Sequence, residues 1–169
     1  MSAPAVVVCL GSWAELAEQA GPIRFQVFVD EQRVPAEMEL DEFDAVSCHA
    51  LALADGCPVG TGRLLPDGHI GRMAVLAGWR GRGVGAALLQ ALIDEAGRRG
   101  MARLVLSAQT HALGFYARFG FVPEGAAYEE AGLPHQGMTR GGLRGRCSAF
   151  RWPGCAPKAE PVRIFVFEA

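Results

Sequence analysis

Apolar positions in the first half of the chain form short runs, the pattern typical of β-strands. The run from Ala5 to Leu10 predicts a first strand. Later runs are separated by the pairs Asp55-Gly56 and Asp67-Gly68, which are typical hairpin turns. The sequence therefore predicts an antiparallel meander whose strands are Cys48 to Ala54, Pro58 to Leu65 and His69 to Leu76.

Two helices are predicted between the first strand and this meander. Ser12 is a suitable N-cap for a short helix that ends at Gly21. Pro22 fits the first turn of a second helix, and Pro35 requires a loop after it. The apolar residues of that second helix are Ile23, Phe25, Val27, Phe28 and Val29.

From Val84 the apolar spacing changes to the helical period, and Gly100 closes the predicted helix. Its apolar face consists of Val84, Leu88, Leu89, Leu92, Ile93 and Ala96. A short strand from Arg103 to Ala108 follows, and Thr110 is the predicted N-cap of one more helix, which ends at Gly120. Strands are then expected from Phe121 and over His135 to Arg140.

The composition indicates one folded domain with an extension. The chain has 169 residues, of which 50% are hydrophobic and 20% charged, enough for one buried core. We expect the domain to cover residues 1–140. Residues 141–169 form an irregular extension rich in Gly, Arg and Pro, with a terminal strand at Arg163 to Phe167. That strand should pair with a sheet edge, either in its own subunit or, as we favour, in a second copy, which makes a homodimer possible.

Charge and cysteine content exclude several classes of protein. A net charge of −2 provides no overall attraction for nucleic acid. The first apolar run is too short to span a membrane and no basic segment precedes it, so we expect a cytoplasmic protein without membrane partners. Five cysteines, an odd number without CxxC spacing, are expected to be reduced thiols and not metal ligands.

The charges are nevertheless unevenly distributed. Residues 30–44 hold seven acidic residues and one basic residue, and this predicts an acidic surface that favours cations. Residues 63–118 show the opposite bias and are expected to favour anions.

The strongest chemical signal is the glycine-rich turn Arg80-Gly81-Arg82-Gly83-Val84-Gly85-Ala86, placed between a strand and the amphipathic helix. Glycines allow close approach of a ligand to the backbone, and the first N–H groups of a helix have no partner within the helix. The turn therefore predicts a phosphate-binding site, although a tight strand-to-helix connection would need similar glycines.

Two other phosphate-binding motifs fit poorly. The Rossmann fingerprint requires an acidic residue about 20 positions later, whereas the next strand reads Leu104 to Gln109 without an acid. The turn also follows an antiparallel meander instead of opening a βαβ unit. A Walker A loop is excluded because its terminal Gly-Lys-Ser/Thr is missing.

The turn resembles the cofactor motif Gln/Arg-x-x-Gly-x-Gly/Ala of the GCN5-related N-acetyltransferases (GNAT). Arg72 to Val75 is similar to the bulged central strand of that family, and Gly114 to Phe121 to its late helix and following strand. The segments Phe28 to Gln32 and Gly132 to His135 resemble the bacterial ElaA/YjcF-like branch. The resemblance covers roughly residues 5–140.

This resemblance implies an α/β (α+β) fold: a mixed, mostly antiparallel sheet with helices on both faces and a splayed parallel strand pair that forms the cofactor cleft. It implies transfer of an acetyl group from acetyl-CoA to a small-molecule or protein amine in a ternary complex. The pyrophosphate would bind the glycine turn, and the pantetheine arm would pair with the exposed strand edge. The expected cofactor-binding residues are Met73, Ala74, Val75, Arg80, Gly81, Arg82, Gly83, Val84, Gly85, Ala86, Gln109 and Tyr116.

The same resemblance implies roles in proton transfer. Tyr116 would protonate the CoA thiolate, and the Val75 N–H would polarise the thioester carbonyl. For the base, Glu31 and His135 are the first choices, while His49, the carboxylates of residues 37–44 or a water chain stay open. Many family members carry an Asn where this chain has Gln109, so that amide contact is a weaker expectation. A CoA-binding sensor without turnover is the alternative function.

Overall fold

An antiparallel meander forms the centre of the structure, as the apolar runs predict. The structure is a computed structural model that describes residues 5–141. In it, the first four strands form three successive antiparallel pairs, β1 with β2, β2 with β3 and β3 with β4. These strands are β1 (Val6–Gly11), β2 (Cys48–Ala54), β3 (Cys57–Leu64) and β4 (His69–Val75).

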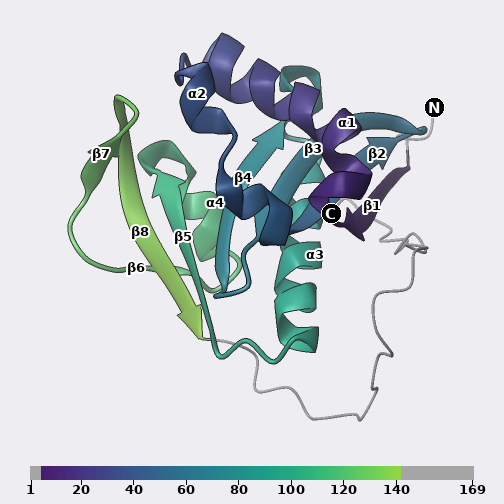
Figure 1. The fold of residues 1–169 in the computed structure, drawn as a ribbon. Helices are drawn as coiled ribbons and strands as arrows, with labels where there is room; N and C mark the ends of the chain where they lie inside the picture. Colours follow the sequence, from purple (N-terminus) through teal and green to yellow (C-terminus); the bar gives the residue numbers. More distant parts are fainter. Residues whose placement is uncertain (1–4, 142–169) are drawn as a thin grey trace.

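The second half of the sheet is joined to the meander by one parallel contact. Strand β5 (Arg103–Gln109) runs parallel to β4, and β8 (Leu133–Gly141) pairs antiparallel with β5. The short strands β6 (Val122–Pro123) and β7 (Tyr128–Glu130) both pair with β8. The described residues thus form an eight-stranded mixed sheet in the order β1-β2-β3-β4-β5-β8-β6, with β7 beside β8 (Figure 1).

Helices cover both faces of this sheet, which confirms the expected fold class. Helix α3 (Val84–Arg98) packs on one face and buries its whole predicted apolar side, and α1 (Trp13–Arg24) packs on the other. Strand β2 is buried on both sides because alanines such as Ala50 and Ala52 face α3, while Leu51 faces α1. The remaining helices are the short α2 (Ala36–Glu39) and α4 (Leu113–Ala117).

Two glycines of β3 allow close packing at the centre. A Cβ atom on Gly60 would lie 2.9 Å from Leu88 of α3, and one on Gly62 would lie 2.5 Å from the sulfur of Met73. Real Cβ atoms do not approach other atoms this closely, so a larger residue at either position would force the Leu88 or Met73 side chain to move.

The first two predicted helices are one continuous helical segment, and the predicted break at Gly21 is wrong. Ser12 does begin α1, with its backbone N–H donating to the Glu15 carboxylate at 2.8 Å. The helix then runs through Gly21 and Pro22 and passes directly into a π-helix, η1 (Phe25–Glu31). Pro22 lies on an exposed position, while Ala20, Ile23 and Val27 are buried against the sheet. Burial of that apolar face therefore outweighs the local breaking signals.

The predicted cap at Thr110 is also wrong. Residues Thr110–Ala112 form a 3₁₀ turn, η4, and α4 begins one turn later, after Ala112. Two further 3₁₀ turns, η2 (Glu42–Val46) and η3 (Ala77–Trp79), complete the described chain. Neither α2 nor β7 was predicted from the sequence.

Some expectations fall outside residues 5–141. The extension beyond residue 141 and its expected strand at Arg163 to Phe167 lie outside the described residues. Within the described range, Cys9, Cys48 and Cys57 are free thiols. None of the helices described there is long and apolar enough to cross a membrane.

Candidate functional site

The site is an opening in the sheet where β4 and β5 separate. The two strands pair only at His69 with Val105 and at Ile70 with Leu106. Beyond Ile70 the chain of β4 bulges, because Gly71 pairs with Arg63 but the next pair joins Ala74 to Thr61. Figure 1 shows β4 and β5 diverging from their shared end. The bulge and the separation together expose the outer edge of β4.

The exposed edge of β4 offers a backbone N–H at Val75. The Leu76 N–H donates to the Val59 carbonyl of β3 at 3.0 Å. Successive backbone groups of a strand point to opposite edges, so the N–H and carbonyl of Val75 point away from β3. The Val75 carbonyl accordingly accepts a hydrogen bond of 2.9 Å from Arg80 Nε. The Val75 N–H is therefore directed into the opening.

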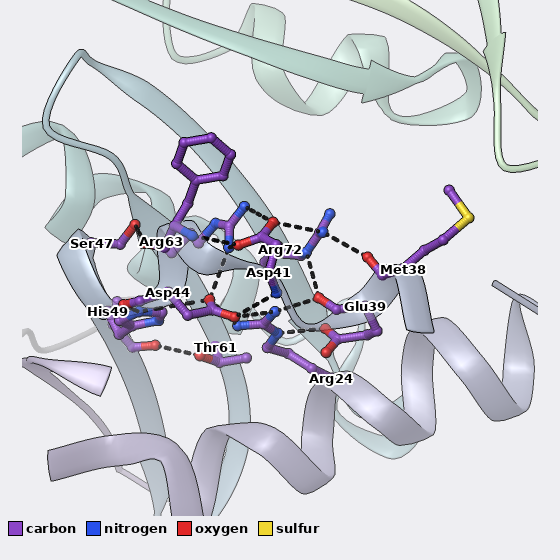
Figure 2. A network of polar contacts seen from close by, with 12 residues as sticks. Arg24, Met38, Glu39, Asp41, Asp44, Ser47, His49, Thr61, Arg63 and Arg72 are labelled. Atoms are coloured by element: carbon purple, nitrogen blue, oxygen red, sulfur yellow. Dashed lines mark hydrogen bonds and ion pairs between the residues drawn. The ribbon is translucent and has the colours of Figure 1, made fainter. Parts of the chain in front are cut away.

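Arg72 occupies the bulge in a left-handed conformation, with φ 49°. This conformation is costly for a residue with a Cβ, by roughly 1–3 kcal/mol. Its guanidinium donates to the carbonyls of Met38 (3.1 Å) and Glu39 (3.2 Å) and to Asp41 Oδ2 (3.1 Å). Three contacts to the 38–41 segment thus hold the bulge in place (Figure 2).

Behind Arg72 lies a buried network of opposite charges, which Figure 2 shows between α1, the 38–47 segment and the sheet. Arg24 of α1 pairs with Glu39 at 2.5 Å and with Asp44 at 2.6 Å. Arg63 of β3 pairs with Asp44 at 2.8 Å and with Asp41 at 2.7 Å. The network therefore joins α1 and the central strands to the segment that holds the bulge.

The network shows that the predicted acidic surface over residues 30–44 is wrong at Glu39 and Asp44. Glu39 and Asp44 are only 4% and 2% exposed, and both are neutralised by arginines. Hydrogen bonds from Arg63 lower the pKa of Asp41. Burial acts to raise the pKa of Asp44, but the hydrogen bonds and charges of Arg24 and Arg63 outweigh it and the pKa is lowered. Residues 63–118 were expected to favour anions, but the charge of Arg63 is already neutralised by these pairs. The charge of Arg72 is likewise paired with Asp41.

The opening forms one cleft of about 870 Å³ that is lined from both faces of the sheet. On the α3 face it is lined by the glycine turn and by α4. On the α1 face it is lined by η1, the 34–39 segment, the end of β5 and the β7-β8 hairpin. Of the predicted site residues, those that line it are Met73, Ala74, Val75, Arg80, Gly81, Gly83, Gly85, Ala86, Gln109, Tyr116 and His135.

The glycine turn leads into α3 and leaves its first N–H groups uncapped. Gly81 and Gly83 have φ of 72° and 76°, values that glycine adopts without strain. Gly83 is the N-cap and provides no side-chain cap. A Cβ on Gly81 would meet nothing within 4 Å, so space for a ligand lies beside the turn. An uncapped helix N-terminus beside open space is suited to an anion such as a phosphate.

The two arginines of the turn differ in their contacts. Arg80 Nη2 pairs with Glu31 at 2.6 Å, while Arg80 Nε donates to the Val75 carbonyl. Arg82 lies over the ring of Trp79, 5.2 Å from its centroid, and does not line the cleft. Val84, the first residue of α3, is buried in the core and does not line the cleft either.

Tyr116 of α4 is held by aromatic neighbours. Its ring meets Phe115 and Phe121 edge-on, at centroid distances of 5.0 and 6.2 Å. Burial raises the pKa of Tyr116 to about 12. The phenol therefore keeps its proton throughout the neutral range and can donate a hydrogen bond into the cleft.

The candidate bases occupy very different places. His135 is 9% exposed, lines the cleft, and its Nδ1 lies 2.8 Å from the Leu133 carbonyl. Because a carbonyl only accepts, Nδ1 carries the proton of the neutral ring and Nε2 has a lone pair. Glu31 is outside the cleft lining and is bound to Arg80. His49 is buried in the charge network, where its Nε2 lies 3.0 Å from the Asp44 carbonyl.

A polar contact crosses the α1 side of the cleft. Gln109, at the end of β5, donates from Nε2 to Gln32 Oε1 at 2.8 Å, although the two residues are 77 positions apart. Both residues line the cleft. The amide of Gln109 is therefore in the cleft, as expected, and Gln32 fixes its orientation.

Sequence reasoning missed a second polar group, formed by Ser107, Tyr128 and Glu130. Ser107 Oγ is hydrogen-bonded to the Tyr128 hydroxyl and donates to Glu130 at 3.3 Å. The hairpin between β7 and β8 brings them together through its turn at Ala131 and Gly132, which have φ of 50° and 75°. A two-residue turn of this kind signals a hairpin, but an Ala-Gly pair is a weak form of that signal.

Comparison with known proteins agrees with this geometry. The family model described as an acetyltransferase (GNAT) domain matches residues 15–140. The chain is 38% identical over 130 residues to the uncharacterized N-acetyltransferase YjcF of Bacillus subtilis (strain 168), covering 75% of this chain and 93% of that protein.

Solved structures share the fold of this chain. The crystal structure of Escherichia coli ElaA has a TM-score of 0.73 and 30% identity, and covers 80% of this chain and 99% of that one. An acyl-CoA N-acyltransferase from Pseudomonas aeruginosa has a TM-score of 0.72 and 32% identity, with the same coverage. With its splayed β4 and β5, its uncapped glycine turn and this match over residues 15–140, the chain belongs to the GNAT acetyltransferase family.

Proposed function

We propose that this protein transfers an acetyl group from acetyl-CoA directly to an amine bound in the same cleft. Membership of the GNAT family supports acyl transfer from a CoA thioester. The observation that carries the proposal is the single cleft in which the exposed β4 edge, the uncapped start of α3 and the Tyr116 phenol meet. The choice of acetyl among acyl groups, and of an amine as acceptor, is part of the proposal.

The cofactor would lie along the α3 side of this cleft. Its pyrophosphate would accept from the N–H groups at the start of α3, where Gly83 leaves the helix uncapped and Gly81 leaves room. Its pantetheine arm would run along β4 like an added strand, with the Gln109 amide opposite. The Val75 N–H would donate to the thioester oxygen as negative charge develops on it, while Arg80 holds the carbonyl of the same residue.

The acceptor would enter from the α1 side. His135 Nε2 would take a proton from the acceptor ammonium, and the free amine would attack the thioester carbonyl carbon. Collapse of the tetrahedral adduct breaks the carbon–sulfur bond and leaves a thiolate, and the nitrogen loses its second proton to solvent to give the neutral amide. Tyr116 would donate its hydroxyl proton toward that sulfur and regain a proton from solvent. The products are an N-acetylated amine and CoA.

In this proposal Glu31 is not the general base. Its carboxylate pairs with Arg80, which in turn holds the Val75 carbonyl. Glu31 would therefore act as a positioning residue for the β4 edge, and proton removal would belong to His135.

The test is release of free thiol from acetyl-CoA in the presence of a panel of primary amines. Amine-dependent release with formation of the N-acetyl product is the expected result. Calorimetry with acetyl-CoA on the same protein distinguishes the alternative. Tight binding of acetyl-CoA with no amine-dependent release of thiol for any acceptor would favour a CoA-binding sensor. Thiol release with propionyl-CoA and hexanoyl-CoA as donors tests the preference for acetyl.

A further inference from the structure

The β7-β8 hairpin presents a row of side chains to the cleft. Tyr128 pairs directly with His135, and Glu130 pairs with Leu133. Directly paired residues and residues two positions apart share one face of an antiparallel pair, so these four side chains lie on one face. Three of them line the cleft: Glu130, Leu133 and His135.

Strand β5 continues this row. Gln109 pairs with His135 and Ser107 with Gly137, so the side chains of Gln109 and Ser107 point to the same face. The Ser107 hydroxyl contacts Tyr128 and Glu130. The Tyr128 ring stacks on His135, with centroids 6.1 Å apart and an interplanar angle of 19°. Glu130 is thereby attached to the same cluster as the proposed base.

Glu130 differs from the other carboxylate that lines the cleft. Glu39 is buried and paired with Arg24 at 2.5 Å. Among the ion pairs within residues 5–141, Glu130 has no basic partner and accepts only from a neutral hydroxyl. The basic residues of the lining are Arg72, Arg80, Arg118 and the histidines 111 and 135. Arg72 is held by Asp41 and Arg80 by Glu31, so neither neutralises Glu130.

The spacing along the hairpin defines a second contact point. Glu130 lies two residues beyond the level of Tyr128 and His135, a rise of about 7 Å along the strand. Leu133, directly opposite Glu130, provides an apolar surface beside it. A carboxylate at this distance from the base, with an apolar residue beside it, suits a second ammonium group joined to the reacting amine by a short alkyl chain.

We propose that Glu130 is a specificity-determining residue that binds the distal ammonium of an alkyl diamine acceptor. The role of His135 in this inference rests on the proposed function. The binding of the cation by Glu130 does not depend on that function. Ser107 holds the carboxylate in position, and the alkyl chain of the acceptor lies along Leu133. Monoamines of the same length lack the charge that Glu130 binds.

The test compares putrescine with butylamine in thiol-release kinetics. The variants are Glu130→Gln, which keeps an oxygen that can accept from Ser107, and the matched control Glu129→Gln. Glu129 is exposed on the same short strand but does not line the cleft. We expect Glu130→Gln to raise the KM for putrescine about tenfold, the loss typical of one hydrogen-bonded charge pair. Its kcat, and both constants for butylamine, should stay near those of the native protein, as should all constants of Glu129→Gln.

Equal use of the two amines by the native protein, or an equal effect of Glu130→Gln on both, would overturn the proposal. Calorimetry of putrescine with the native protein and both variants, in the presence of CoA, tests the site without turnover. Weaker binding in Glu130→Gln alone supports the cation site even if no amine is acetylated, in which case only the proposed function fails. Unchanged putrescine binding in Glu130→Gln overturns the inference.

Discussion

At the scale of single residues, the environment of Tyr116 determines what its hydroxyl can do. Apolar and aromatic neighbours bury the ring and raise its pKa to about 12. A phenol that stays protonated at neutral pH is a hydrogen-bond donor to a leaving thiolate and cannot serve as a base there.

Replacing Tyr116 by Phe removes that donor and keeps the packed ring. We expect kcat to fall about 10²-fold, while acetyl-CoA affinity and the melting temperature stay unchanged. Steady-state kinetics together with calorimetry and thermal unfolding measure all three. Native-like kcat in the variant would mean that solvent or another group protonates the sulfur. Because the pKa of Tyr116 is about 12, the native rate should show no loss from its ionisation between pH 7 and 9.

At the scale of elements, the start of α3 combines a tight turn with space for a ligand. Gly85 lies in the first turn of α3, and a Cβ there would be 3.5 Å from Phe115 and 3.8 Å from Val75. A methyl group fits these contacts, but the larger side chain of Val would fill the cleft between the turn and β4.

We therefore expect Gly85→Val to weaken acetyl-CoA binding by at least tenfold without unfolding the protein. Gly83→Val should weaken it too, but its φ of 76° adds backbone strain, so Gly85 gives the clearer test. Gly78→Val is the control, because an added Cβ there meets nothing within 4 Å and the residue is outside the cleft lining. Calorimetry measures the affinities. Unchanged affinity in Gly85→Val would contradict the assignment of the turn to the cofactor.

The charge network joins several elements, and its contribution to the stability of the fold can be measured. Arg24→Met removes the buried cation between Glu39 and Asp44 and leaves the Glu39 carboxylate without a partner. Loss of one partner of a buried pair costs about 3–5 kcal/mol of unfolding free energy. Arg98→Met breaks the exposed pair with Glu95 on α3 and should cost less than about 1 kcal/mol. Urea unfolding of both variants checks the contrast, and similar losses would show that the network contributes little.

At the scale of the whole molecule, the network makes stability depend on pH. Burial lowers the pKa of His49 below its ordinary 6.5. The unfolded chain then binds a proton more readily than the folded one, so stability is complete above pH 6.5 and decreases as the pH falls below it. The lowered pKa values of Asp41 and Asp44 act in a separate window, since their contribution is lost only as the pH falls below 3.8.

We expect the unfolding free energy of the native protein to decrease between pH 7 and 5. Wherever His49 is protonated in the unfolded chain but not in the folded one, the decrease is about 1.4 kcal/mol per pH unit. In His49→Gln this decrease should become smaller, whatever the absolute stability of the variant. His111→Gln, at an exposed position, should keep the native slope. Urea titrations at several pH values measure these slopes, and equal slopes in native protein and His49→Gln would assign the dependence to other groups.

Much of the fold was determined by local sequence. The turn pairs Asp55-Gly56 and Asp67-Gly68 and the apolar runs between them fixed the meander, because strand period and turn residues act between neighbours. The helical period after Val84 and the glycines before it determined α3 and its open N-terminus. The glycine turn could accordingly be predicted as a phosphate site, whereas Tyr116 and His135 were predicted as site residues only through the family resemblance. One cleft is lined by Gly81, Gly83, Gly85, Tyr116 and His135.

Only the tertiary structure decided the pairing of charges and the shape of the opening. Arg24 meets residues 15 and 20 positions away, and these contacts convert an acidic sequence into a buried, neutralised support for the β4 bulge. Burial of Ile23 and Val27 carries the helix through Gly21 and Pro22. Glu130 reaches the cleft through a hairpin with a weak local signal. Each outcome depends on contacts between distant segments, whose energies outweigh local propensity and cannot be read from the order of residues alone.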